Sequence, residues 1–318
     1  MSSDPARLFE TPGKRAEWIG TRERGSSALL KVMVFLSLRL GRRASRSVLY
    51  GIALYFFLFA PTARRNSRRY LRRALGRRPT PADGFRHVLY FATCIHDRVY
   101  LVKQQYERFH ITIDGEALMR EQLESGRGAF LMGAHLGSFE VLRSVGHRQP
   151  GLSVSMAMYE HNARKINAMM AAVDPQAKAD IVPLGEIAAM LRISDRLERG
   201  GFVGVLGDRT LSDEPLQSVR LLGERAQLPV GPMRAAAILR RPVFFMAGLY
   251  RGANRYHLVF EPIADFSTTP AGQRDSARTR VAFDSKQKLR GDEHRRDCEL
   301  QALARIVARC ARAFVDFH

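Results

Sequence analysis

The stretch Gly133-Ala134-His135-Leu136-Gly137-Ser138-Phe139-Glu140 decides how the centre of this chain should fold. It follows an apolar run at residues 129–132 that is typical of a buried strand, and its glycines come where the chain must turn. We therefore expect a strand over 129–134, a loop, and a helix over 138–147 with Ser138 as its N-cap. Glu140 then falls in the first helical turn, where the exposed amides favour a negative charge.

His135 and Glu140 are the candidate catalytic pair of this stretch. On one continuous helix, five residues turn about 500°, so the two side chains would face different ways. With His135 in the loop and Glu140 in the helix they can meet, and a carboxylate on one ring nitrogen leaves the other free to take a proton. The alternative is that Glu140 pairs with Arg143 one turn on, and that His135 is only a polar residue at a strand end.

Outward from this stretch, strand-like and helix-like segments alternate, which predicts the α/β class. We expect a mixed, mainly parallel central sheet with helices on both faces. The glycine-containing turn at residues 252–254 should make the last two strands an antiparallel edge. Strands are expected at 111–113, 129–134, 152–158, 179–183, 202–208, 243–249 and 255–261, and helices at 85–108, 138–147, 161–173, 186–199 and 232–240.

The carboxyl ends of these strands are the expected place for a site. His135 and Asp208 both lie at such ends, so the two side chains should share one edge of the sheet. The three cysteines, Cys94, Cys298 and Cys310, have neither zinc-ligand spacing nor even pairing. They suggest a reducing compartment, and we expect no metal site and no cofactor.

The charge of the chain is concentrated near its start. The formal net charge is +20, and residues 24–82 contain fourteen Arg and Lys but no Asp or Glu. An uncharged run of thirteen residues, 48–60, lies inside this basic region. A basic stripe alone would suit nucleic acid or an anionic membrane, but a nucleic-acid binder has no need for the apolar run. The expected membrane-binding residues are Phe56, Phe57, Arg64, Arg65, Arg68, Arg69, Arg72 and Arg73.

The apolar run is too short for a simple membrane span. Thirteen residues form a helix of about 20 Å, whereas the hydrocarbon core is about 30 Å thick. Because arginines flank both ends of the run, we predict an interfacial or re-entrant anchor on the cytoplasmic leaflet. The alternatives are one tilted span that starts near Ala28 and a helix buried in the globular core.

The chain therefore divides into three expected regions. Residues 1–27 form a polar lead without the apolar core of a signal peptide. Residues 28–78 form the membrane-attachment region, which the break at Pro79-Thr80-Pro81 separates from a catalytic domain at 79–318. Within that domain, residues 267–297 are highly charged and are expected to form a mobile loop, and a final amphipathic helix follows them.

The block GAHLGSFE resembles the His-x4-Asp/Glu signature of the lysophospholipid acyltransferase superfamily, and it is most similar to the late acyltransferases of lipid A biosynthesis. Three departures concern the acceptor. Ala134 stands where relatives often carry Asn or Thr, and residues 207–209 read Gly-Asp-Arg where lipid A enzymes more often have Asp-Gln. The aromatic-rich C-terminal tail common among lipid A enzymes is also missing, since Trp18 is the only tryptophan. The reaction type is nevertheless clear from the resemblance. Further matching blocks follow in the expected order at residues 159–164, 204–209, 222–223, 228–232 and 241–245.

The resemblance implies transfer of a fatty acyl chain from the thioester of acyl carrier protein to a hydroxyl of a lipid or glycolipid. The acceptor would be similar to lipid A or to an aryl polyene lipid. His135 would act as the general base, and Glu140 would hold the imidazole and stabilise its charged form. Donors for the oxyanion would be Arg164 or backbone amides near Gly137. The implied substrate-binding residues are Gly137, Ser138, Asn162, Arg164, Asp208 and Arg209.

The same resemblance places the protein on the cytoplasmic face of the inner membrane of a Gram-negative bacterium. Its expected partners are acyl carrier protein as donor, anionic membrane lipid and the lipid acceptor, with no nucleic acid. A different class of function remains open, namely a non-catalytic lipid- or acyl-carrier-binding protein on the same fold.

Overall fold

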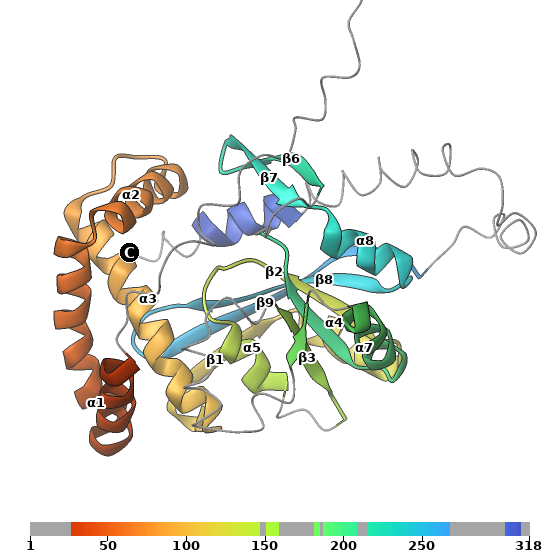
Figure 1. Ribbon diagram of the computed structural model, residues 1–318, viewed down its shortest axis with the longest axis horizontal. Helices are drawn as coiled ribbons and strands as arrows, with labels where there is room; N and C mark the ends of the chain where they lie inside the picture. Colours follow the sequence, from red (N-terminus) through yellow and green to blue (C-terminus); the bar gives the residue numbers. More distant parts are fainter. Residues whose placement is uncertain are drawn as a thin grey trace, which may run out of the picture.

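A computed structural model describes residues 27–146, 151–158, 181–184, 187–208, 215–267 and 303–312. A central sheet occupies the middle of the molecule, and three long N-terminal helices stand along one side of it (Figure 1). The predicted polar lead, the helix at 161–173 and almost all of the charged loop at 267–297 lie outside the described residues.

The central sheet has seven strands in the order β1-β9-β8-β2-β5-β3-β4. Each neighbouring pair is parallel except β8 and β9, which are antiparallel. This confirms the mixed, mainly parallel sheet. The predicted edge position of the β8–β9 pair is wrong, because β1 pairs with the outer side of β9. The strands are β1 (His110–Asp114), β2 (Ala129–Gly133), β3 (Val154–Met158), β4 (Ile181–Pro183), β5 (Phe202–Leu206), β8 (Pro242–Tyr250) and β9 (Arg255–Asp265).

Helices cover both faces of this sheet. Successive side chains of β2 point to opposite faces. Leu131 lines a pocket together with Phe139 of α5, whereas Met132 lies near Gly207 and Leu303 of the helix at 303–312. All five residues of β2 are buried, as expected for a strand inside a parallel sheet. The helices after β1 are α4 (Glu116–Glu124), α5 (Phe139–Gly146), α7 (Ile187–Glu198) and α8 (Gly231–Ile238).

A second, two-stranded sheet was not predicted from the sequence. It consists of β6 (Leu216–Leu221) and β7 (Glu224–Pro229), which pair antiparallel. The turn between them contains Gly223 and Leu222, both with positive φ. This hairpin projects beyond the central sheet on the same side as α2 (Figure 1). Arg73 of α2 (Pro61–Leu75) forms an ion pair with Glu224, so the hairpin and the arginine-rich helix are in contact.

The N-terminal helices are α1 (Ser27–Phe59), α2 and α3 (Pro81–Val102). α1 is kinked at Gly41, whose φ of 75° and ψ of 170° are not helical. Among the described residues, no single helix is long and apolar enough to cross a membrane. One pair, Ser37–Phe59 and Pro61–Leu75, passes that test by length and composition and is bent by 95°.

α3 begins at the break that the sequence predicted. Thr80 accepts a hydrogen bond from the Asp83 amide and Asp83 accepts one from Thr80, which is a capping box, and Pro81 occupies the first turn. The helix starts earlier than the predicted residue 85 and ends at Val102 rather than residue 108. A short 3-10 turn at Tyr106–Arg108 follows it instead.

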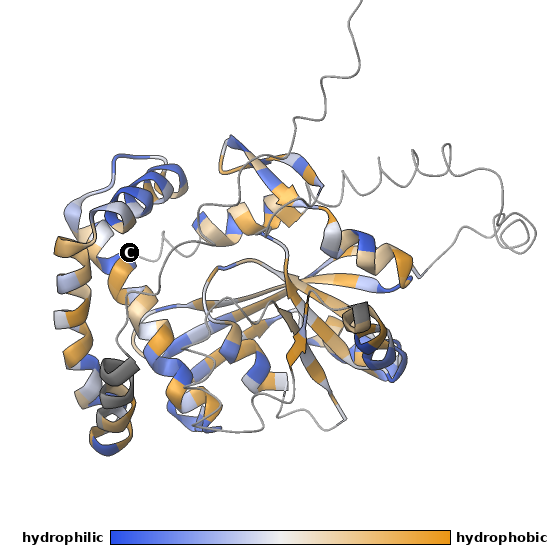
Figure 2. Cartoon of the chain, in the orientation of Figure 1, coloured by the Kyte–Doolittle hydropathy of each residue, from blue (hydrophilic) through white to orange (hydrophobic). Residues whose placement is uncertain are grey.

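α1 packs only one of its faces. Leu49 and Ala53 are buried against Leu89 of α3. Large apolar side chains on other faces are exposed, among them Tyr55 at 59% and Phe59 at 67%. Figure 2 shows the contrast between α1, with its hydrophobic stretches, and the largely hydrophilic α2. The helix is therefore not buried in the globular core, which was one of the alternatives considered.

Candidate active site

The loop between β2 and α5 is held against β8 by two glycines. Gly137 has a φ of 78°, and a Cβ on it would lie 2.0 Å from the carbonyl oxygen of Gly248. A Cβ on Gly248 would in turn lie 2.4 Å from the carbonyl oxygen of Ser138. The Ser138 amide donates to the Gly248 carbonyl over 2.7 Å. Only glycine leaves room for two backbones to approach so closely. Gly137 and Gly248 therefore allow the loop to bind β8 through the Ser138 amide.

His135 stands in this loop and is held by Asp208. Nδ1 of His135 lies 2.8 Å from Oδ1 of Asp208, and the His135 amide donates to Oδ2 over 3.0 Å. Strands β2 and β5 are neighbours, and both residues follow their carboxyl ends. The His135 side chain is 40% exposed and that of Asp208 is 27% exposed. Among the described residues none hydrogen-bonds Nε2 of His135, so this nitrogen can face a substrate.

The predicted contact between His135 and Glu140 is not the one that the structure forms. Glu140 lies in the first turn of α5, as expected, but its Oε2 is 3.7 Å from Nε of Arg143. Asp208 occupies the Nδ1 side of the ring instead. From the family resemblance, Asp208 had been expected among the substrate-binding residues. The shared sheet edge of His135 and Asp208 was the signal from which this contact could have been found.

Ser138 does not cap α5 as predicted. Its side chain is 1% exposed, and its hydroxyl oxygen has no hydrogen-bond partner among the described residues. The α5 amide groups at Phe139 and Glu140 follow it directly. Gly137 and Ser138 stand in the same loop as His135, and their role in binding substrate stays a prediction. Asn162, Arg164 and Arg209, the other predicted contacts, lie outside the described residues.

An apolar pocket lies between the sheet and helices α4 and α5. Its walls could not be assigned from the sequence, because they come from eight different elements. Phe139 and Leu142 place one wall of the pocket on the helix that follows His135, and Glu116 and Arg120 line it from α4. The sheet contributes Ile113, Leu131, Val154, Phe202, Met246 and Phe260.

The arginines expected to bind a membrane are exposed on α2. These are Arg64, Arg65, Arg68, Arg69, Arg72 and Arg73. Phe56 of α1 is 37% exposed. Phe57 is half-buried, because its ring meets Phe85 of α3 edge to face and the guanidinium of Arg64 lies over it. Phe56 can thus face a lipid surface, whereas Phe57 packs mainly inward.

Residues 21–280 match the model of a protein family described as bacterial lipid A biosynthesis acyltransferase. The match covers the three N-terminal helices, the loop with His135 and the whole central sheet. It confirms the resemblance drawn from the sequence. No curated protein matches the chain.

Proposed function

The chain belongs to the family of bacterial lipid A biosynthesis acyltransferases, and from this premise we propose that it moves a fatty acyl chain from acyl carrier protein to a hydroxyl of a membrane lipid or glycolipid. The observation that carries the proposal is the pair formed by His135 and Asp208 at the carboxyl ends of β2 and β5. The acceptor would be a lipid A precursor, an aryl polyene lipid or another lipid with a comparable hydroxyl.

His135 is the proposed general base. A carboxylate beside Nδ1 holds the proton on that nitrogen, which leaves Nε2 to remove the proton from the acceptor hydroxyl. Asp208 meets this requirement at 2.8 Å and fixes the loop through the His135 amide as well. Glu140 remains in the proposal as a second carboxylate, five residues along, whose negative charge favours the imidazolium after proton transfer. Its ion pair with Arg143 weakens that contribution.

The start of α5 is the proposed position of the oxyanion. When the hydroxyl attacks the thioester, the carbonyl oxygen becomes negative and needs donors in a site with little water. The amides that open α5 follow His135 within five residues, and the buried Ser138 hydroxyl is available beside them. Arg164 is the further donor proposed from the family resemblance, and Asn162 and Arg209 would contact the substrates.

The apolar pocket is the proposed place of the acyl chain. Its walls are almost entirely hydrocarbon, and Phe139 and Leu142 connect it to the helix that begins beside the base. Burying each methylene group there contributes about 0.8 kcal/mol. The acyl chain would therefore be bound by the sheet and α5, while the thioester remains at the loop.

The basic region has two proposed partners. The exposed arginines of α2 suit anionic lipid headgroups, and the exposed apolar residues of α1 suit the boundary of the acyl chains. Acyl carrier proteins are acidic, so the net charge of +20 would also steer the donor to the site. We place the protein on the cytoplasmic face of the inner membrane of a Gram-negative bacterium.

Mass spectrometry of total lipids tests the catalytic proposal. The native host without its own copy of the gene would produce either the wild type or His135→Ala. A lipid that gains one acyl chain only with the wild type would establish the transfer and identify both acceptor and chain. Identical lipid profiles, with both proteins folded and on the membrane, would instead favour a non-catalytic lipid- or acyl-carrier-binding protein.

Sedimentation with vesicles tests the membrane proposal. The variant Arg68→Glu/Arg72→Glu should release the protein from anionic vesicles, because four units of charge change on the exposed face of α2. The matched control is Arg192→Glu/Arg199→Glu, which makes the same charge change on exposed residues of α7 and of the turn that follows it. Equal binding by the two variants would contradict the assignment of α2 to the membrane. Binding that persists after nuclease treatment would exclude nucleic acid as the bridge.

A further inference from the structure

A buried polar cluster joins α1 to the turn between β8 and β9. Nε and Nη2 of Arg42 each lie 2.8 Å from an oxygen of Asp97 on α3. Tyr256 of β9 donates its hydroxyl to the same carboxylate over 2.8 Å. The Arg42 side chain is 9% exposed and that of Asp97 is 0% exposed. A desolvated ion pair of this kind contributes little net stability, but it enforces one arrangement of the groups that it connects.

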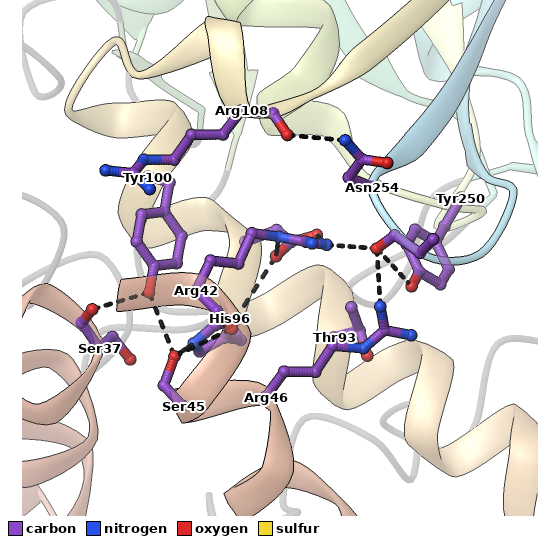
Figure 3. Close-up of polar contacts among 12 residues, drawn as sticks. Ser37, Arg42, Ser45, Arg46, Thr93, His96, Tyr100, Arg108, Tyr250 and Asn254 are labelled. Atoms are coloured by element: carbon purple, nitrogen blue, oxygen red, sulfur yellow. Dashed lines mark hydrogen bonds and ion pairs between the residues drawn. The ribbon is translucent and has the colours of Figure 1, made fainter. Parts of the chain in front are cut away.

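The carbonyl of Ala253 is the point where α1 meets the turn. Arg42 donates to this oxygen over 2.6 Å, Arg46 over 2.9 Å and Tyr250 over 3.1 Å. Figure 3 shows Arg42 and Arg46 of α1 directed at the turn that follows Tyr250. Ala253 has a φ of 51°, which is uncommon for a residue with a side chain. Three donors on one carbonyl hold this strained turn in place.

The kink of α1 is built into the same cluster. Gly41 directly precedes Arg42, and its positive φ ends the first half of the helix. The Tyr100 hydroxyl donates to the carbonyl of Ser37 over 2.8 Å. The Ser45 hydroxyl contacts His96 at 2.8 Å. The helix is thus fixed to α3 on both sides of its kink.

The turn leads directly to the catalytic loop. Gly248, which accepts from the Ser138 amide, precedes Ala253 by five residues and lies on β8. Residues 248–250 are the buried last residues of β8, and the turn that carries Ala253 follows them directly. The end of β8 and its turn therefore connect the carbonyl held by Arg42 and Arg46 with the loop that carries His135. Exposed apolar residues of α1 lie on both sides of Arg42. They are Phe35, Leu38 and Leu40 before it, and Val48, Tyr50, Leu54, Tyr55, Phe56, Leu58 and Phe59 after it.

We propose that Arg42, Asp97, Tyr256 and the Ala253 carbonyl form a joint that holds the membrane-facing side of α1 at a fixed position relative to His135. This inference rests on the proposed function. An acceptor lipid keeps its headgroup at the membrane surface, so the height of the base above that surface determines whether its hydroxyl reaches Nε2. A displacement of about 1 Å from productive geometry can lower a rate about 10²-fold. The joint residues are positioning residues and touch no substrate.

The test compares one reaction in two settings. Acyl carrier protein with a long-chain acyl thioester would be the donor. The total lipid extract of the host without the gene would be the acceptor source, presented either as vesicles or dissolved in non-ionic detergent micelles. The variant is Arg42→Met/Asp97→Asn, which leaves no unpaired buried charge. The matched control is Arg43→Met, which removes the neighbouring exposed arginine.

We expect the double variant to lose at least about 10-fold in rate on vesicles and less than about 3-fold in micelles, with unchanged sedimentation. In micelles the acceptor can approach from any direction, so the height of the base no longer matters. Arg43→Met should behave as the wild type in both settings. Equal losses in both settings would show that the cluster only stabilises the fold, and no loss on vesicles would overturn the proposal.

A second measurement is independent of catalysis. Spin labels at Tyr55→Cys on α1 and Leu191→Cys on α7, both exposed positions, would report the distance between anchor and catalytic domain in a Cys298→Ser background. The distance distribution should be narrow in the otherwise wild-type chain and broad in the double variant. Identical distance distributions in the two proteins would contradict the proposed joint. A failure of acyl transfer by the wild type in both settings would contradict the proposed function, while the spin labels would still decide the joint.

Discussion

Two of the histidine–carboxylate pairs in the described part of the chain, His96–Asp97 and His135–Asp208, differ in their access to water. His96 and Asp97 are both buried, and Arg42 and Tyr256 add donors to the carboxylate. His135 and Asp208 are partly exposed at the end of the sheet, and the imidazole keeps one nitrogen toward the open side. Burial with several donors fixes a structure, whereas partial exposure with one carboxylate leaves a group that can exchange a proton with a substrate. The difference in burial thus separates the joint from the proposed active site.

The largest effect should follow from removing the proposed base. His135→Ala should lower kcat for acyl transfer by about 10²- to 10⁴-fold, the range that general bases contribute. The matched control is His257→Ala. His257 lies on β9 and also pairs with a carboxylate, since its Nε2 lies 2.9 Å from Oδ2 of Asp114 on β1. Steady-state rates with acyl carrier protein thioester as donor measure both. A rate for His135→Ala within about 3-fold of the control would contradict its role as a base.

Breaking the buried ion pair of Arg42 and Asp97 should lower the stability of the protein. Asp97→Asn should lower the free energy of unfolding by about 3–5 kcal/mol, because it leaves the Arg42 guanidinium buried without its counter-charge. Replacing Arg42 by Met in the same chain should recover most of that loss. Urea unfolding of the wild type and both variants measures this. A double variant less stable than Asp97→Asn would contradict the account of the pair.

The buried histidine His87 on α3 should give a smaller effect that depends on pH. Burial lowers the pKa of His87 from 6.5 to about 4. Its Nδ1 lies 2.7 Å from the Ser67 hydroxyl, and its ring stacks on Tyr70 of α2. As pH falls, His87 is protonated in the unfolded chain before it is protonated in the folded chain. The stability that neutral His87 contributes is therefore fully present above pH 6.5 and is lost as pH falls toward 4. Between neutral pH and about pH 5, His87 should lower the free energy of unfolding by about 2 kcal/mol.

Thermal and urea unfolding at both pH values measure this loss. His87→Gln cannot titrate, so its free energy of unfolding should fall by about 2 kcal/mol less than that of the wild type over the same interval. The same pH dependence in the two proteins would show that other groups cause it.

The smallest effect is expected for the exposed pair itself. Asp208→Asn should change the free energy of unfolding by less than about 1 kcal/mol, since partly exposed ion pairs contribute little. Urea unfolding of Asp208→Asn and of Asp97→Asn, each measured against the wild type, compares the two carboxylates directly. A loss as large as that of Asp97→Asn would mean that Asp208 is a structural residue, and the contrast between the two pairs would disappear.

The sequence was sufficient for the local geometry of the site and insufficient for its contacts. Strand β2, the loop and the start of α5 follow from the apolar run and the glycines. The shared edge of His135 and Asp208 follows from parallel strands. Glu140 was predicted as the partner of His135 because spacing along the chain constrains it, whereas the contact with Asp208 that the structure shows depends on β2 and β5 being neighbours in the sheet. Strand order is a tertiary property that a single sequence does not reveal.

The N-terminal region shows the same limit. Its basic and apolar character predicted the exposed surface of α1 and α2. Arg42, however, was taken as one more arginine beside a membrane anchor, whereas it is buried with Asp97, 55 residues away. The β6–β7 hairpin was missed because its strands alternate weakly and carry several polar residues. For Arg42, the partner that determines burial lies far away in the chain.

The most direct test of the central claim is the tautomer of His135. Long-range proton–nitrogen correlation spectra of protein labelled with ¹⁵N-histidine report which ring nitrogen carries the proton, and His135→Ala assigns the signal. With the imidazole neutral, the proton should reside on Nδ1 in the wild type and in Glu140→Gln, and Asp208→Asn should populate the other tautomer. A spectrum unchanged by Asp208→Asn but altered by Glu140→Gln would contradict the account and restore Glu140 as the carboxylate that orients the base.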